Sequence, residues 1–229
     1  MSSQVRIFRR LEWAFPIRPV QREVLVSKPD EDAGLFGSGG RRPPLLFVPG
    51  FRHGAWVFAE HWLEHAAERG FPAYAMSLRG HGESADAPKT TLRAFTHDVV
   101  QVAARLPRQA VLIGHGIGGL AVARALARYP ARAGVLVAPV FGGFDTFWTA
   151  LVRNPPGTLP AVFGARLTLR RGQLFGHELG TPTARDYAAR MAGGRAAPLA
   201  QWQMLLHRAP DFQCMSYPLS ILQTILSYG

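Results

Sequence analysis

The segment 114–118, which reads Gly-His-Gly-Ile-Gly, carries the strongest chemical signal in the sequence. It follows a short apolar run, Val111–Ile113, and precedes an alanine-rich stretch typical of a helix. A strand–turn–helix of the form G-x-S-x-G presents a nucleophilic serine at the tip of a sharp turn. Gly116 occupies the position of that serine. The turn therefore has the spacing for covalent catalysis without the side chain that would perform it.

The same letters also spell G-x-G-x-x-G through Gly114, Gly116 and Gly119, the pattern of a dinucleotide-binding turn. Such a site requires an acidic residue about 20 residues further on, at the end of the next strand, to hold the ribose. The next apolar run, 134–137, continues into Ala-Pro-Val and contains no carboxylate. Nucleotide binding is therefore the less favoured interpretation of this turn.

Two further motifs precede the turn. The apolar run Leu45–Val48 ends in the sequence PGFRHGAW (49–56), and a second run, 73–78, enters RGHGES (79–84). A helix is expected between them, with Phe58, Trp62 and Ala66 at four-residue spacing. In this order, these motifs and the GHxxGG turn resemble the α/β-hydrolase family over about residues 44–140. The resemblance implies an α/β fold with a mostly parallel sheet, flanking helices and a helical cap insertion.

The resemblance also assigns roles around the turn. Gly114, His115 and Gly118 would form the elbow around the vacant position Gly116. The backbone N–H groups of Phe51 and Ile117 would be the oxyanion donors and contact the substrate. A serine hydrolase also needs a histidine base and an orienting carboxylate. The family places both late in the chain, and we expect that C-terminal part to be missing, so the sequence leaves open whether the protein is an enzyme.

The remaining histidines give only weak candidates for catalysis. His53 lies in the loop after the first apolar run, and an imidazole pKa near 6.5 would suit a general base there. His115 is expected to pack beneath the turn. His61 and His65 lack the H-E-x-x-H pattern of a zinc site, and one cysteine, Cys214, supplies no metal cluster. We expect neither a metal nor a cofactor.

Charge and composition limit the partners. The formal net charge is +11, but the arginines are scattered along the chain in short pairs, so we expect no nucleic-acid partner. No apolar run approaches the ~20 residues of a membrane span, and the first residues do not form a secretory signal. We therefore expect no membrane association and a cytoplasmic location. A positive surface favours an anionic or acyl small-molecule ligand.

The chain divides into three predicted parts. Residues 1–140 would form the N-terminal part of the core, 141–210 the helical cap insertion, and 211–229 a remnant of the C-terminal core. Alternation of apolar and polar residues over 11–27 predicts two antiparallel edge strands. Asp145, beside two glycines, is expected in a loop after the last strand of the core.

Three functional hypotheses remain open, all derived from an ancestor that hydrolysed small ester- or amide-like compounds. The protein is a ligand-binding pseudoenzyme, a non-hydrolytic enzyme for elimination or cyclisation that uses the oxyanion hole, or the product of an interrupted hydrolase gene. In each, serine-dependent hydrolysis is absent because Gly116 has no side chain to acylate.

Overall fold

The computed structural model describes residues 17–29, 42–87, 90–139, 144–163, 168, 170, 172 and 179–192. Five strands form one sheet in the order β1-β3-β2-β4-β5. β1 runs antiparallel to β3, and the other pairs are parallel. This arrangement confirms the predicted mostly parallel sheet. The strands are β1 (Val24–Ser27), β2 (Leu45–Val48), β3 (Ala73–Met76), β4 (Val111–His115) and β5 (Ala133–Val137).

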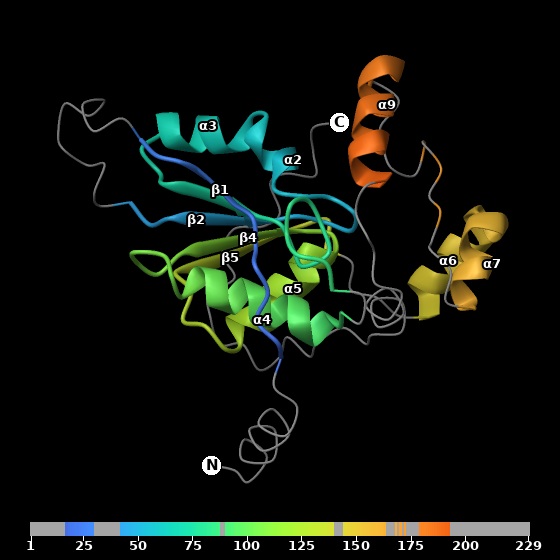
Figure 1. Ribbon diagram of the computed structural model, residues 1–229, viewed down its shortest axis with the longest axis horizontal. Coiled ribbons are helices and arrows are strands. Elements are labelled where there is room, and N and C mark those ends of the chain that lie inside the picture. The colour runs from blue at the N-terminus through green and yellow to red at the C-terminus, as the bar shows by residue number, and fades with distance from the viewer. Residues whose placement is uncertain are drawn as a thin grey trace, which may run out of the picture.

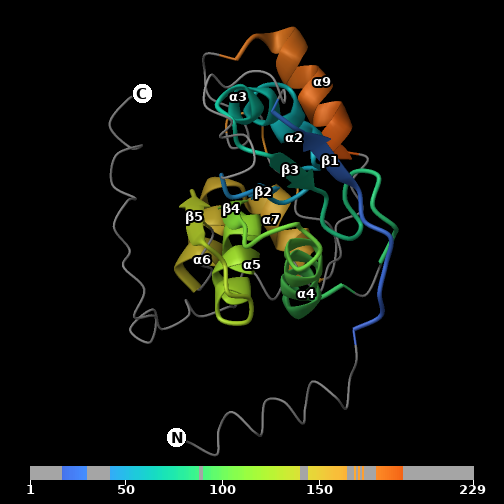
Figure 2. The same cartoon turned by 90° about the vertical axis from the view of Figure 1, so that its left-hand side faces the viewer.

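Helices cover both faces of the sheet, as Figures 1 and 2 show. Strands buried on two faces read as continuous apolar runs, as β2 does. Along β2, Leu46 and Val48 join one core cluster, while Phe47 joins the other. One face carries α2 (Trp56–Ala59) and α3 (Trp62–Glu68), and the opposite face carries α4 (Leu92–Ala103) and α5 (Ile117–Leu126).

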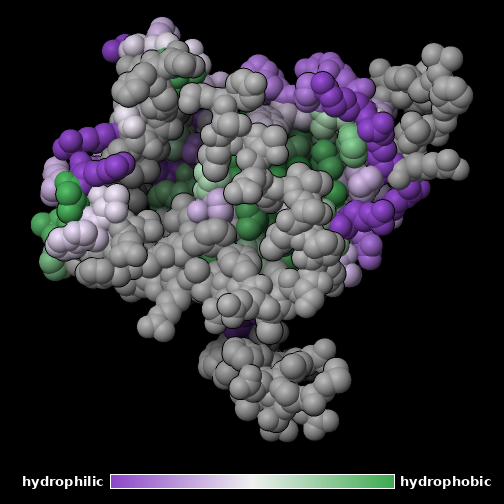
Figure 3. Space-filling view, turned by 180° about the vertical axis from the view of Figure 1, so that it is seen from behind, coloured by the Kyte–Doolittle hydropathy of each residue, from purple (hydrophilic) through white to green (hydrophobic). Residues whose placement is uncertain are grey.

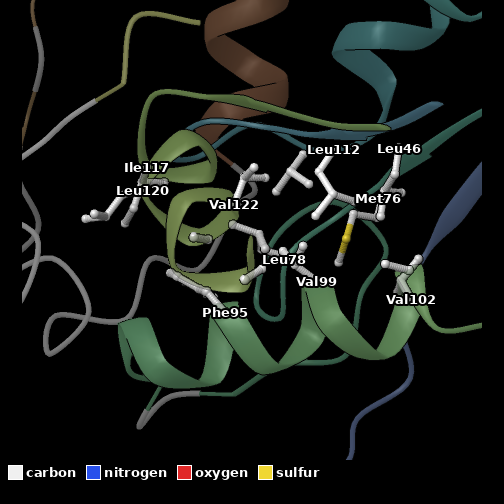
Figure 4. Close-up of a cluster of buried hydrophobic side chains, with 14 of the residues drawn as sticks. Leu46, Met76, Leu78, Phe95, Val99, Val102, Leu112, Ile117, Leu120 and Val122 are labelled. Atoms are coloured by element: carbon white, nitrogen blue, oxygen red, sulfur yellow. The ribbon is translucent and has the colours of Figure 1, made fainter. Parts of the chain in front are cut away.

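The larger core cluster fixes the helix that follows the elbow. Leu112 of β4 and Met76 of β3 pack with Phe95 and Val99 of α4 and with Leu120 of α5. Figure 4 shows these side chains meeting between the sheet and the two helices. Each buried Leu or Phe of this kind contributes about 1.5–3 kcal/mol. The N-terminal end of α5, and with it the elbow, is thereby anchored to the sheet.

Three helices follow β5: α6 (Phe144–Arg153), α7 (Pro155–Val162) and α9 (Thr181–Ala192). The break between α6 and α7 falls at Asn154-Pro155, as the sequence predicts, because proline is favoured in the first turn of a helix. Asp145 lies in α6, so its prediction as a loop residue is wrong. The proposed cap, 141–210, and the remnant, 211–229, stay predictions, and residues 193–229 lie outside the described residues.

Exposed apolar side chains gather at the α6–α7 end of the molecule, next to strongly hydrophilic residues (Figure 3). They are Trp148, Val152, Leu159 and Phe163. Among the helices of the described part, none combines the length and the apolar character that crossing a membrane requires.

Two local predictions differ from the structure. The helix expected through Phe58, Trp62 and Ala66 is interrupted at His61, where the backbone leaves the helical region (φ −145°, ψ −42°), and it forms α2 and α3 instead. Of the two edge strands expected over 11–27, β1 is present, residues 17–23 form none, and 11–16 lie outside the described residues. Residues 17–23 instead bond to the loop after β3, since the carbonyls of Gln21 and Glu23 accept from Ala85 and Ser77.

Candidate functional site

The elbow is a tight turn between β4 and α5. Gly116, at its tip, has φ +55° and ψ −119°, a backbone conformation that side chains rarely adopt and that is a feature of strained elbow turns. Its N–H donates to the carbonyl of Val137 in β5 (3.1 Å), and its carbonyl accepts from Leu120 in α5 (3.3 Å). Both neighbouring elements therefore hold the turn in place.

Packing explains the other elbow glycines but not Gly116. A Cβ on Gly114 would lie 2.5 Å from the carbonyl oxygen of Gly118, and a Cβ on Gly118 would lie 2.5 Å from the carbonyl oxygen of Val48. At Gly116 the nearest atom would be the Cα of Gly50, at an ordinary 3.6 Å. Position 116 therefore has room for a side chain that the sequence does not supply.

The loop after β2 lies against this tip. A Cβ on Gly50 would lie 2.7 Å from Nδ1 of His115, so glycine lets the loop approach β4. Arg52 has φ +64°, and the N–H of His53 closes the turn onto the carbonyl of Gly50 (3.2 Å). The loop thus places the backbone of Phe51, the residue after Gly50, beside the elbow.

The two expected oxyanion donors are the N–H groups of Phe51 and Ile117. Within the described part of the chain, neither donates to a protein acceptor. Ile117 is 0% exposed and begins α5, whose first N–H groups have no acceptor within the helix. Buried amides without acceptors are rare, and a helix N-terminus favours negative charge. That these two groups bind a ligand oxygen and form an oxyanion hole stays a prediction.

Three histidines surround this loop. The His53 ring lies tilted against Trp56 (ring centroids 6.1 Å apart) and perpendicular to His115 (6.0 Å), and its Nδ1 lies 2.9 Å from the carbonyl of Phe51. His81 is buried between Phe51 and Phe95, with Nδ1 3.1 Å from the carbonyl of Arg79. Since a carbonyl only accepts, Nδ1 carries the proton in both rings. The rings of His53 and His115 thus meet beside the elbow, and a general-base role for His53 stays a prediction.

Burial makes these imidazoles weak bases. Burial lowers the pKa of His53 to about 4. The hydrogen bond to the Phe51 carbonyl raises this pKa by a smaller amount, and the charges of His115, His81 and Arg52 lower it further. Burial also lowers the pKa of His81 and His115. All three are neutral at pH 7, so His53 accepts a proton less readily than its ordinary pKa near 6.5 suggests.

We expect acid to destabilise the fold through His53. The unfolded chain binds this proton near pH 6.5 and the folded chain near pH 4, so the free energy of unfolding decreases as the pH falls between these values, by on the order of 3 kcal/mol. Urea unfolding at pH 7, 5.5 and 4.5 measures the loss. His53→Gln should flatten the profile, whereas His61→Gln, at an exposed position, should not. An unchanged slope in His53→Gln would refute this assignment.

A network of polar side chains supports the loop after β2, and the sequence did not predict this network. The hydroxyl of Ser77 donates to Oε2 of Glu23 (2.5 Å) and accepts from the N–H of Ala55 (2.7 Å). The hydroxyl of Ser84 donates to the Ser77 carbonyl and accepts from the Glu23 N–H. Ser84 is thus part of the scaffold and not a replacement nucleophile. A carboxylate directly before a short strand, as at Glu23, is the only sequence sign of this network.

His61 precedes α3 directly and His65 lies within it. His61 and His65 are exposed, and the described residues contain no group of three or more potential metal ligands. Glu60, just before this segment, accepts hydrogen bonds from Tyr187 and Arg190 of α9.

The fold and the elbow together define an α/β hydrolase. Residues 45–226 match the model of the family described as "Alpha/beta hydrolase family", and the chain belongs to that family. This confirms the resemblance seen in the sequence and removes the basis for a dinucleotide-binding fold.

Individual relatives are more distant. A pimeloyl-[acyl-carrier protein] methyl ester esterase from Salmonella heidelberg is 29% identical over 188 residues, which cover 76% of this chain and 65% of the esterase. This chain therefore aligns with about two thirds of the length of that relative.

Solved structures show the same fold. An N-formylmaleamic acid deformylase from Pseudomonas putida superposes with a TM-score of 0.58 at 18% identity, covering 82% of this chain and 71% of that one. A serine-to-glycine variant of the N-acyl homoserine lactonase AidH, in complex with N-hexanoyl homoserine lactone, gives 0.55 at 18% identity and covers 82% and 70%.

Proposed function

We propose that this α/β-hydrolase-family protein binds a small acyl compound or carboxylate at the elbow and does not hydrolyse it through an elbow serine. The observation that carries the proposal is the vacancy at Gly116, a strained turn with space for a Cβ, next to two N–H groups that have no acceptor among the described residues. A ligand oxygen between Phe51 and Ile117 would satisfy both donors. The net charge of +11 favours an anionic ligand.

Relatives support the ligand class. The curated relative is named for a methyl ester substrate, and a solved relative carries an acyl lactone in a serine-to-glycine variant. Esters, lactones and carboxylates share the carbonyl oxygen that an oxyanion hole accepts. We therefore assign small esters, lactones and their acids as the ligand class of this chain.

Two features of the described residues argue against hydrolysis through an elbow serine. Gly116 cannot form an acyl-enzyme, and His53, the histidine beside the loop, has a pKa of about 4. An oxyanion hole and binding alone accelerate hydrolysis by roughly 10³–10⁴-fold over water. A non-hydrolytic reaction that uses the oxyanion hole with His53 is the second candidate, favoured by the position of His53 between Trp56 and His115.

The test is calorimetric titration with acetate, butanoate, hexanoate and benzoate. We expect at least one to bind with a dissociation constant of about 1 mM or below, equivalent to roughly −4 kcal/mol. Gly116→Leu should abolish carboxylate binding, because the leucine side chain fills the vacancy. Gly116→Ser imposes the same backbone strain on the turn with a small side chain, so it should retain binding. Absence of binding by all four acids, or equal binding in Gly116→Leu, would disprove the proposal.

A further inference from the structure

The carboxylate of Glu60 joins helix α9 to the core. Glu60, directly after α2, accepts a hydrogen bond from the Tyr187 hydroxyl at Oε2 and one from Nη1 of Arg190 at Oε1 (2.9 Å). Tyr187 and Arg190 lie one turn apart on α9, so they share one face of the helix. Both oxygens of Glu60 thus hold the same face of α9.

An unbroken series of ring contacts leads from this junction to the elbow. The Trp56 ring lies 5.6 Å from the Tyr187 ring, and the Arg190 guanidinium lies 5.2 Å from the Trp56 centroid. Trp56 in turn packs on His53, and His53 packs on His115. Any displacement of α9 therefore removes packing from one side of the loop that contains Phe51.

A second contact fixes the loop backbone. Nε of Arg52 donates to the carbonyl of Met191 at the C-terminal end of α9 (3.3 Å). Arg52 has φ +64°, which a non-glycine residue maintains only when its surroundings hold it. Because Arg52 follows Phe51 directly, the contact with α9 helps to set the direction of the Phe51 N–H.

We propose that Glu60 is a positioning residue that couples the docking of α9 to the geometry of the Phe51 donor. When Glu60 holds α9, Trp56 and Arg52 fix the loop and the anion site is preorganised. When α9 undocks, the loop relaxes and the site weakens. Coupling of this kind is reciprocal, so an occupied site also favours docked α9. The effect on ligands rests on the proposed function, whereas the link between α9 and the loop does not.

Hydrogen exchange on the full chain tests that link without a ligand. In Glu60→Ala we expect the rate of amide exchange to rise about 10-fold in both 181–192 and 51–57. In Tyr187→Phe, which keeps the ring on Trp56, we expect a rise of about 3-fold in the same two segments. Glu64→Ala, which removes an exposed carboxylate from α3, should leave both segments unchanged. A rise confined to α9, or no rise in either segment, would overturn the coupling.

Titration with hexanoate tests whether this coupling changes the affinity of the site for a ligand. We expect affinity to fall about 5- to 10-fold in Glu60→Ala, at the lower end of the typical range of coupling between sites. Affinity should stay unchanged in Glu64→Ala. Equal affinity in Glu60→Ala and the parent would contradict the effect on the site. If none of the four carboxylates binds the parent while exchange remains coupled, the proposed function fails and the positioning role of Glu60 stands.

Discussion

Gly118→Ala is expected to cost about 3 kcal/mol or more of the free energy of unfolding, because overpacking against rigid neighbours is strongly destabilising. The new Cβ would lie 2.5 Å from the carbonyl oxygen of Val48 and closer still to that of Pro49. Both are backbone atoms at the end of β2, the central strand of the sheet. Relief would require α5 to move away from the sheet, together with Ile117 and Leu120 of the core.

Two substitutions serve as controls in urea unfolding followed by circular dichroism. Gly172→Ala adds the same methyl group where no atom lies within 4 Å, and it should change stability little. Gly116→Ala should lower the free energy of unfolding by about 1–3 kcal/mol, because alanine is strained at a positive φ. Its Cβ has space, so no steric clash adds to this cost. If Gly118→Ala proved as stable as Gly172→Ala, the close approach of α5 to β2 would be wrong.

Asp98→Asn should destabilise the protein by about 3–5 kcal/mol, the usual cost of breaking a buried ion pair from one side. Asp98 is fully buried in α4 and accepts from Nε and Nη2 of Arg79 (2.7 and 2.5 Å) and from Nη1 of Arg22 (2.6 Å). Asparagine would leave two nearly buried guanidinium groups without their counter-charge. The loop after β3 and the segment before β1 would then lose their shared anchor.

The matched control is Asp186→Asn, at an exposed position on α9, which should change stability by less than about 0.5 kcal/mol. Chemical unfolding at pH 7 compares the two variants. Equal stability of Asp98→Asn and Asp186→Asn would show that the buried triad contributes nothing.

Local sequence patterns predicted most of the fold. The apolar runs at β2 and β4 predicted strands, and the glycine spacing at 114–118 predicted the turn between β4 and α5. These features depend on neighbours within a few residues, so the sequence shows them directly. The expected place of Phe51 beside the elbow came from the family resemblance and agrees with the contact between Gly50 and His115.

Polar pairing over long sequence separations could not be predicted. Ser77 and Glu23 are 54 residues apart, Arg22 and Asp98 are 76 apart, and Tyr187 and Glu60 are 127 apart. Such pairs leave no periodic signal, because only the folded topology brings them together. The low basicity of His53 was missed for a similar reason, since it follows from burial by Trp56, His115 and the loop itself.

An amide NMR titration with hexanoate tests most directly whether the vacant elbow binds an anion. We expect the Phe51 and Ile117 amide protons to move downfield and to saturate together, because both would donate to one ligand oxygen. Gly116→Leu should abolish these shifts. If hexanoate moves other amides while those of Phe51 and Ile117 stay unchanged, the ligand binds elsewhere and the elbow is only a structural turn.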